Sequence, residues 1–220
     1  MIGIVGKPEN TTKRLNYILV NNEIRKCIVN NGGLPIGILP MDDSFKLKGE
    51  GNKYELTSED ISNLKEVISR VDGIILQGGL VSNAYEEEIV KICLSTNKPI
   101  LGICSGFNNM VRAIGGSLYE KKNNIHNKYD ENYVHNVIIN KSSYLYKILK
   151  KDIIPVNSIH IRVTDMNNIK NCRATAICSI DNTVEAIEIE EQKFAIGIKW
   201  HPELMSEMNN IFKEFVEVLK

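Results

Sequence analysis

The sequence predicts an α/β fold with a mostly parallel central sheet, and its alternating pattern carries that prediction. Short apolar runs of strand length alternate with longer stretches in which apolar residues recur at helical spacing. Several of these runs end in glycine or proline, as at Pro40 and Gly78-Gly79, which favour turns. Strands alternating with helices form βαβ units, whose strands lie parallel in one sheet, with helices on both faces. The second half is richer in strands and predicts a small antiparallel region.

Buried strands are predicted in the first half at residues 2–5, 34–39, 73–76 and 99–103. Helices are predicted at residues 17–31, 58–70, 85–96 and 105–114. The helix at 58–70 has the clearest start, because Thr57 or Ser58 can cap it. Glu86 to Glu88 open the next helix, where negative charge is favourable in any case.

The second half predicts strands at residues 134–139, 174–179, 184–189 and 194–199. Short loops join the last three, so we expect an antiparallel meander there. A final helix is predicted at 205–219, and the polar stretch 120–132 is expected to be a surface loop. Because no internal repeat or low-complexity linker interrupts the chain, residues 1–220 are expected to form a single domain.

Composition limits the classes of partner. Lys plus Arg and Asp plus Glu each number 27, so no uniformly basic surface for nucleic acid is indicated. The five cysteines have no CxxC spacing, which argues against a disulfide framework and a zinc ribbon. The start of the chain lacks the features of a signal peptide, and no apolar run is long enough to span a membrane. We therefore expect a cytoplasmic protein with neither a nucleic-acid nor a membrane partner.

A thiol at a strand–helix turn is the sharpest chemical signal. Cys104 stands between Gly102 and Gly106, where a predicted buried strand meets a predicted helix. This spacing is typical of a nucleophile elbow, whose tight turn leaves no room for side chains beside the nucleophile. The helix dipole favours a thiolate, and the backbone N–H of Ser105 would face an oxyanion. A buried, purely packing cysteine is the alternative.

A possible base lies at the end of another strand. In Trp200-His201-Pro202-Glu203, residues 201 and 203 point the same way if the backbone is extended, and the proline favours that conformation at His201. Glu203 can then orient the imidazole while its other nitrogen takes a proton from a nucleophile. A surface histidine beside a proline is the simpler interpretation of this motif alone.

A diglycine follows a third predicted strand. Gly78-Gly79 would let the backbone approach a ligand closely, although a plain turn is the favoured interpretation of this motif alone. All three signals fall at the carboxyl ends of predicted strands, where α/β sheets bind ligands. Together they favour a cysteine-dependent enzyme site.

Other titratable residues are expected to be structural. His126 and His135 lie nine residues apart around the polar loop, a spacing that does not suit a metal pair on one face, and no cysteine joins them in sequence. The cysteines outside the elbow lie among apolar residues and are expected to serve packing: Cys27, Cys93, Cys172 and Cys178. We therefore expect no metal site and no cofactor.

These motifs resemble the class I glutamine amidotransferase superfamily, whose members carry a GxCxG elbow and a terminal HPE. The chain is most similar to the gamma-glutamyl-gamma-aminobutyrate hydrolase branch. That similarity rests on residues 32–35, on Asn157-Ser158-Ile-His160 and on residues 181–188. The resemblance covers almost the whole chain and implies a flavodoxin-like arrangement of the sheet.

The resemblance implies a role for each matching residue. Cys104 would be the nucleophile, His201 the base and Glu203 its orienting carboxylate. Gly78 or Gly79 and Ser105 would supply the N–H groups of the oxyanion hole. Asn108, Ser158 and His160 would line the substrate pocket. The implied reaction is hydrolysis of a gamma-glutamyl amide to glutamate and a free amine through a gamma-glutamyl thioester.

Departures from the branch leave alternatives open. Leu80, Ser105, Asn108 and Lys199 stand where the branch commonly has an acidic residue, Arg, Gln and Gln. A glutaminase subunit that passes ammonia to a partner synthase is one alternative, and a non-catalytic ligand-binding relative is another. The leaving amine, and the choice between a homodimer and a synthase partner, are not determined by the sequence.

Overall fold

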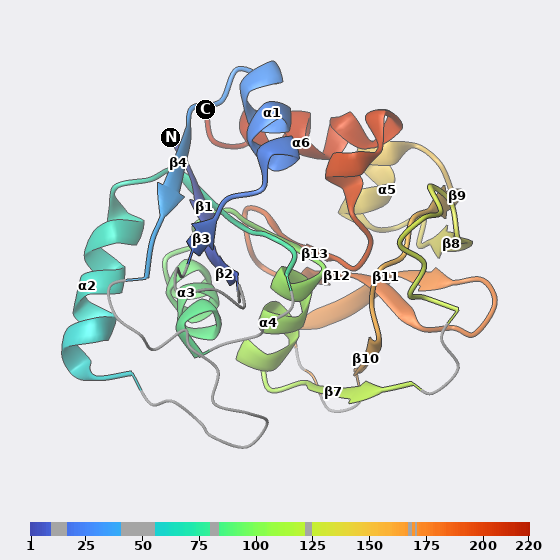
Figure 1. Cartoon of the computed structure of the whole chain (residues 1–220), viewed down its shortest axis with the longest axis horizontal. Helices are drawn as coiled ribbons and strands as arrows, with labels where there is room; N and C mark the ends of the chain where they lie inside the picture. Colours follow the sequence, from blue (N-terminus) through green and yellow to red (C-terminus); the bar gives the residue numbers. More distant parts are fainter. Residues whose placement is uncertain (10–16, 41–55, 80–83, 122–124, 167–168, 170) are drawn as a thin grey trace.

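One continuous sheet forms the centre of the protein. The computed structural model describes residues 1–9, 17–40, 56–79, 84–121, 125–166, 169 and 171–220. Within these residues, nine strands pair in the order β4-β1-β5-β6-β13-β12-β11-β8-β9 (Figure 1). Their bounds are β1 Ile2–Val5, β4 Pro35–Ile38, β5 Gly73–Leu76, β6 Ile100–Ile103, β8 His135–Ile139, β9 Ile153–Val156, β11 Cys172–Cys178, β12 Val184–Ile189 and β13 Ala195–Ile198.

The sheet has a parallel part and an antiparallel part. Strands β4, β1, β5, β6 and β13 run parallel to their neighbours, while the pairs from β13 to β9 are antiparallel. The predicted α/β class and the meander of β11, β12 and β13 are confirmed. In the parallel part Leu76 pairs with Gly102, and Ile103 pairs with Ile198. The residues that follow β5, β6 and β13 therefore meet beside the carboxyl ends of these strands.

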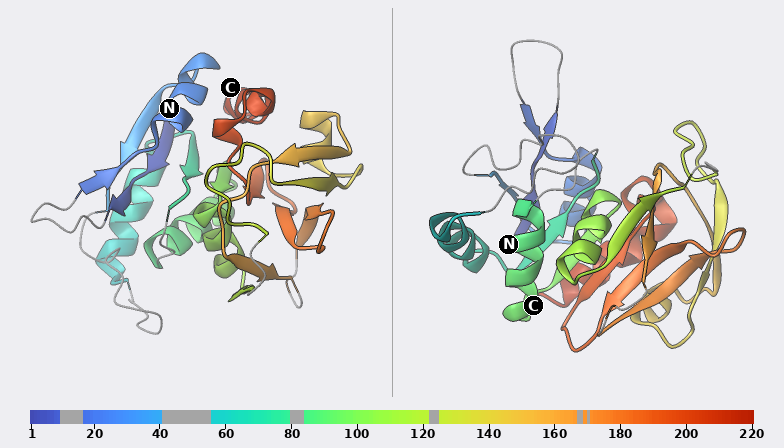
Figure 2. Two further views of the ribbon diagram at one scale, coloured as in Figure 1. Left: turned by 45° about the vertical axis from the view of Figure 1, so that its right-hand side comes forward. Right: turned by 90° about the horizontal axis from the view of Figure 1, so that it is seen from below.

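Helices cover both faces of the sheet, as predicted (Figure 2). Their bounds are α1 Asn22–Asn30, α2 Ser58–Ser69, α3 Ala84–Ser95, α4 Ser105–Ala113, α5 Tyr144–Leu149 and α6 Asn209–Glu217. Buried residues of α1, α5 and α6 pack on one face, and those of α2, α3 and α4 pack on the other. Successive strand residues alternate between the two: Ile75 belongs to the first core, and Ile74 and Leu76 belong to the second.

The predicted helix at 17–31 is wrong at its start. Residues Tyr17–Leu19 form strand β3, which pairs with β2 (Lys7–Glu9). The helix begins only after Asn21, whose side chain accepts hydrogen bonds from the backbone N–H groups of Glu23 and Ile24. Apolar spacing alone could not separate the strand from the helix. Ile18 and Leu19 of the strand continue the helical spacing of Ile24 and Ile28 in α1.

The chain end also differs from the single helix predicted at 205–219. Short 3₁₀ turns occupy Pro202–Leu204 and Ser206–Met208, and α6 begins at Asn209. A further strand pair, β7 (Ser117–Glu120) with β10 (Arg162–Asp165), lies outside the main sheet. The loop predicted at 120–132 is mostly exposed where it is described, yet His126 is buried within it.

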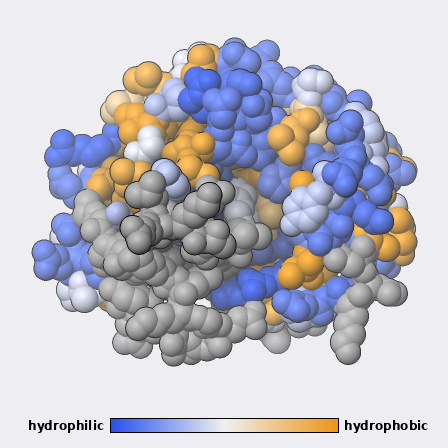
Figure 3. Space-filling view, viewed as in Figure 1, coloured by the Kyte–Doolittle hydropathy of each residue, from blue (hydrophilic) through white to orange (hydrophobic). Residues whose placement is uncertain are grey.

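Exposed apolar side chains gather at one edge of the sheet. Leu19 of β3 and Ile36 of edge strand β4 are exposed, as are Leu34 and Leu39 beside that strand. Figure 3 shows this apolar area at the upper left, where Figure 1 places β3 and β4. Among the residues that the structure describes, no helix has the length and apolar character needed to cross a membrane.

Candidate active site

Cys104 lies on a sharp turn between β6 and α4. Its backbone has φ 52° and ψ −100°, a conformation that costs a residue other than glycine about 1–3 kcal/mol and is typical of functional sites. The Cys104 N–H donates to the carbonyl of Ile198 on β13 at 2.8 Å, and its carbonyl accepts from the N–H of Asn108 at 3.1 Å. The turn is thus fixed on one side by the sheet and on the other by the first turn of α4.

The two elbow glycines allow this turn because no Cβ fits at either position. A Cβ on Gly102 would lie 2.6 Å from Sδ of Met110 and 2.8 Å from the carbonyl carbon of Gly106. A Cβ on Gly106 would lie only 2.2 Å from the carbonyl oxygen of Leu76. The close approach of α4 to β5 and β6 therefore requires glycine.

We expect Gly106→Ala to destabilise the protein by about 1–3 kcal/mol or more, because the backbone of β5 must move to make room for the new methyl group. Urea unfolding monitored by circular dichroism measures this change. Gly37→Ala is the matched control, since its Cβ would meet nothing closer than Cγ2 of Val20 at 3.6 Å. Equal stability of the two variants would show that the elbow tolerates a side chain.

His201 follows β13 and is held on both sides. Its Nδ1 lies 2.8 Å from Oε1 of Glu203, an arrangement that leaves Nε2 as the reactive nitrogen. The side-chain amide of Asn157 fixes its backbone, accepting from the His201 N–H at 2.8 Å and donating to the His201 carbonyl at 2.9 Å. Gly78 leaves space for the ring, because a Cβ there would lie 2.5 Å from Cε1 of His201.

Glu203 is buried and is held by residues from the start of the chain. Its Oε1 also accepts from Nδ2 of Asn21 at 3.1 Å. The Asn21 N–H in turn donates to Oε1 of Gln77 at 2.7 Å, and Nε2 of Gln77 donates to the carbonyls of Val5 and Leu19. The residue that caps α1 thus also orients the carboxylate of the candidate triad.

The thiol and the imidazole affect each other's ionisation. Burial opposes a thiolate at Cys104, but the hydrogen bond to His201 and the positive charges of His201 and Lys199 outweigh burial and lower the pKa of Cys104. Burial likewise opposes a charged His201, yet its contacts with Cys104 and Glu203 raise its pKa well above the ordinary value. Both shifts favour the thiolate–imidazolium form of the pair.

The diglycine and Ser105 lie beside a buried ion pair. Nζ of Lys7 contacts Glu86 and donates to Oγ of Ser105 at 3.1 Å. A Cβ on Gly79 would lie 3.2 Å from Cγ of Lys7, so the lysine stem packs against this glycine. Glu86 does more than favour a helix start, since its carboxylate is buried at the base of the elbow.

Two departures from the branch pattern are in direct contact. Asn108 lies in α4, and its Oδ1 accepts a hydrogen bond from Nζ of Lys199, which is fully buried. The ammonium lies 5.0 Å from the centroid of the Phe107 ring. Burial lowers the pKa of Lys199 to about 8, although the negative charges of Cys104 and Glu185 act against that change.

Ser158 and His160 are buried beside the thiol rather than exposed in an open cleft. The carbonyl between them, that of Ile159, lies 4.0 Å from Sγ of Cys104. The Ser158 hydroxyl lies 3.4 Å from Nδ1 of His126, and the rings of His126 and His160 stack with centroids 4.8 Å apart. Burial lowers the pKa of His160 well below its ordinary value, which favours the neutral imidazole.

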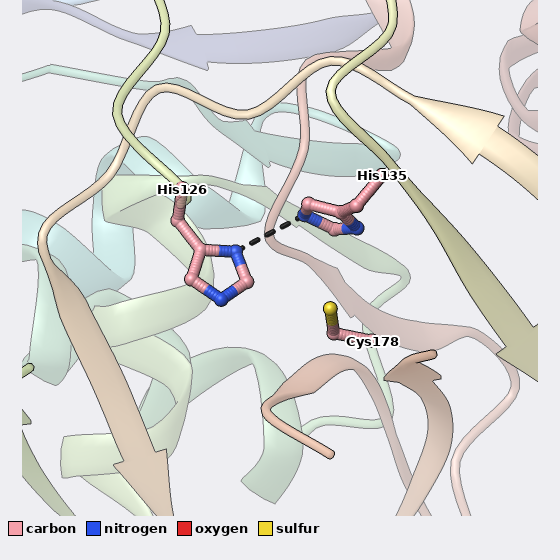
Figure 4. A group of neighbouring side chains, drawn as sticks. All are labelled: His126, His135 and Cys178. Carbon is pink, nitrogen blue, oxygen red and sulfur yellow. Dashed lines mark hydrogen bonds between the residues drawn. The ribbon is translucent and has the colours of Figure 1, made fainter. Parts of the chain in front are cut away.

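His126 and His135, whose sequence spacing does not suit one face of a helix or strand, lie side by side in the fold. Nδ1 of His126 lies 3.1 Å from Nε2 of His135 (Figure 4). The carbonyl of His126 accepts from the N–H of His160, which draws the loop inward, while His135 begins β8. The spacing argument considered only a single helix or strand face, and the fold brings the rings together by another route.

Comparisons with known proteins agree with the fold. Residues 80–203 match the family described as Peptidase C26. A glutamine amidotransferase-like protein of Lactococcus lactis is 25% identical over 99% of this chain and 97% of its own length. The gamma-glutamyl-gamma-aminobutyrate hydrolase of Escherichia coli is 25% identical over 80% of this chain and 75% of its own. The glutaminase domain of the Trypanosoma brucei CTP synthase, solved with bound acivicin, superposes with a TM-score of 0.69 at 16% identity, covering 99% and 92%.

Proposed function

Because the chain belongs to the Peptidase C26 family, we propose that it hydrolyses gamma-glutamyl amides, with Cys104 as the nucleophile. The observation that carries the proposal is the buried contact between Cys104 and His201, together with the carboxylate of Glu203 on the other ring nitrogen. A nucleophile, a base and an orienting acid in this order are the elements of a hydrolytic triad.

The reaction takes place in two steps. The thiolate of Cys104 attacks the carbonyl carbon of the side-chain amide, and the C–N bond breaks as the imidazolium of His201 protonates the departing amine. Glutamate is then attached to the sulfur as a thioester. Water, deprotonated by His201, attacks that thioester, releases glutamate and regenerates the thiolate.

Backbone N–H groups beside the thiol stabilise the oxyanion in this proposal. Ser105 opens α4, where N–H groups point toward developing negative charge, and Gly78 or Gly79 supplies a second donor. Asn108 is the predicted contact to the substrate, and its hydrogen bond to Lys199 holds its amide in place. Ser158 and His160 support the wall of the pocket in this scheme.

The proposed substrate class is supported by the family and by the similarity to the gamma-glutamyl-gamma-aminobutyrate hydrolase of Escherichia coli. The fold shared with the glutaminase domain of the trypanosomal CTP synthase keeps a second candidate in view, in which the chain passes ammonia from glutamine to a synthase. In either case we propose that residues 1–220 act as one domain. That the protein is cytoplasmic and that it forms a homodimer both stay predictions.

A substrate panel tests the proposal. Purified protein is incubated with gamma-glutamyl amides of gamma-aminobutyrate, putrescine, ethylamine and ammonia, and glutamate release is measured. We expect turnover of at least one substituted amide that exceeds glutamine hydrolysis and that Cys104→Ala abolishes.

Trapping the intermediate identifies the nucleophile. A glutamine-like electrophile is expected to label Cys104 alone, as located by peptide mapping, and Cys27 serves as the internal comparison because burial raises its pKa to about 11. Hydrolysis of glutamine with no turnover of the substituted amides would favour the glutaminase candidate. Labelling at another cysteine would contradict the site.

A further inference from the structure

Three of the chain's four histidines surround the carboxylate of Glu185 in β12. Nδ1 of His126 and Nε2 of His160 each lie 3.4 Å from its Oε1, and Nε2 of His135 lies 3.8 Å from it. Figure 4 shows the rings of His126 and His135 turned toward each other. All four side chains are buried, and they come from separate segments of the chain.

The outer nitrogen of each imidazole already has an acceptor. Nε2 of His126 lies 3.0 Å from Oδ2 of Asp181, Nδ1 of His135 lies 3.3 Å from the carbonyl oxygen of Asn136, and Nδ1 of His160 lies 3.2 Å from that of Arg162. Carbonyl and carboxylate oxygens only accept, so these outer nitrogens carry the protons. Each neutral ring then directs its inner nitrogen, with a lone pair, toward the others.

The centre of the cluster is therefore rich in acceptors. Three imidazole lone pairs and a carboxylate oxygen face one another, and the hydroxyl of Ser158 lies near His126. The charge of buried Lys199 acts on Glu185 and His160, but none of the described hydrogen bonds joins it to them. Among the described residues, both oxygens of Glu185 and Nε2 of His160 are buried without a hydrogen-bond partner. Such groups are costly to bury, and a cation between them would pair with Oε1 of Glu185 and Nε2 of His160.

Four of the six separations between the donor atoms lie near those of a tetrahedral metal site. Zinc bonds of about 2.0–2.1 Å place neighbouring donor atoms about 3.3–3.4 Å apart. Oε1 of Glu185 lies 3.4 Å, 3.4 Å and 3.8 Å from the three histidine nitrogens, and the nitrogens of His126 and His135 lie 3.1 Å apart. His126, His160 and Glu185 by themselves lie close enough to hold one ion. We propose that His126, His135, His160 and Glu185 bind one zinc ion. Imidazole and carboxylate donors in this number suit zinc, and no ligand position is left open for chemistry.

Asp181 completes the arrangement from outside. A carboxylate on the far nitrogen of a metal-bound histidine fixes its tautomer and strengthens it as a ligand. The ion would tie β8 and β12 to the segment that contains Asn157, whose amide holds the backbone of His201. The site is thus structural, and it supports the candidate triad from a distance.

A second donor set shares two of the histidines. His126, His135 and Cys178 also lie close enough for one ion (Figure 4). The thiol of Cys178 already accepts from the N–H of Ile180 at 3.5 Å. It is the carboxylate of Glu185 that lacks a partner, so we assign Glu185 as the fourth ligand.

Metal content and cobalt spectroscopy test the proposal in the full-length chain. The Cys104→Ala variant is used as the background, because a thiol beside His201 could itself bind zinc. Protein purified without chelators is expected to contain one equivalent of zinc by mass spectrometry of the metal. After chelation, added Co²⁺ is expected to give the intense visible bands of a tetrahedral site without a thiolate charge-transfer band.

Variants identify the ligands. Glu185→Gln and His160→Asn are expected to weaken Zn²⁺ binding at least tenfold in a competition titration, whereas His201→Asn, the histidine outside the cluster, and Cys178→Ala keep it. An octahedral or absent cobalt spectrum overturns the proposal even if a variant does not fold. A thiolate band that disappears in Cys178→Ala overturns the assignment of Glu185. Because these measurements do not use turnover, they stand or fall separately from the proposed reaction.

Discussion

Replacing His201 with glutamine is expected to abolish turnover of a gamma-glutamyl amide by about 10⁴-fold or more, because one residue both sustains the thiolate and transfers the proton. The thiol pKa is lowered chiefly through its hydrogen bond to His201 and the charge of that ring, against the effect of burial. Without the ring, burial and the charge of Glu203 still raise the pKa of Cys104 and the charge of Lys199 lowers it, so the pKa rises toward its ordinary value.

The sign of the pH dependence follows from these shifts. In the native protein the pair stays ionised between the lowered pKa of Cys104 and the raised pKa of His201, so alkylation by iodoacetamide should vary little with pH in that window. In His201→Gln the rate should fall about tenfold for each pH unit below the thiol pKa. At pH 6.5 the thiolate fraction drops at least about 100-fold. A more basic thiolate is more nucleophilic, so the net loss is about tenfold.

Peptide mapping confirms that the measured alkylation occurs at Cys104, and Cys104→Ala supplies the background rate. Glu203→Gln is the graded comparison, because it retains the imidazole and removes only the carboxylate charge beside Nδ1 of His201. Its alkylation rate should lie between those of the native protein and His201→Gln. An unchanged rate profile in His201→Gln would mean that another group sustains the thiolate. Lys199, which also lowers the pKa of Cys104, would then be the residue to replace.

Local pattern predicted the elements that position the site. The strands of the parallel part begin and end within one residue of prediction, because they are apolar throughout and several are bounded by glycine or proline. The elbow and the motif from His201 to Glu203 could be predicted for the same reason. In each of these motifs, the residues that fix the geometry lie within a few positions of one another in the sequence.

The contacts that hold those residues could not be predicted in this way. Asn21, Gln77 and Asn157 reach the candidate triad across the fold, from positions far away in the sequence. Gln77 and Asn157 bond to backbone groups, which nearly every residue carries and which leave no mark in the sequence. The only local sign was at Asn157, which belongs to the segment that resembles the hydrolase branch. The buried carboxylates at positions 86 and 185 were missed likewise, because each stands where a charge suits the local pattern.

Breaking the buried pair of Lys7 and Glu86 is expected to cost about 3–5 kcal/mol of unfolding free energy, the largest stability effect among these predictions. Both side chains are buried, and Glu86 also accepts from Nδ2 of Asn109 at 2.5 Å. Lys7→Met removes one cation from beside Glu86, and Glu86→Gln removes one anion from beside Lys7. Either variant therefore retains one member of the pair as a buried charge.

The pair is separated from ordinary surface charge by comparison with Glu66→Gln. Glu66 contacts Arg70 across an exposed face of α2, and such pairs contribute less than about 1 kcal/mol. Urea unfolding of all three single variants gives the costs on one scale. A loss below about 1 kcal/mol for Lys7→Met would mean that solvent reaches Glu86 and that the pair is not buried in solution.

The double variant Lys7→Met with Glu86→Leu distinguishes a stabilising pair from a merely compensated one. It removes both charges and fills the space with apolar atoms, so it should recover most of the stability that either single change loses. Its catalytic effect is expected to differ, because Lys7 also donates to Oγ of Ser105 beside the thiol. A buried pair of charges is often no more stabilising than two well-packed apolar side chains. Recovered stability with reduced turnover would therefore show that the ion pair supports catalysis at the elbow rather than the stability of the fold.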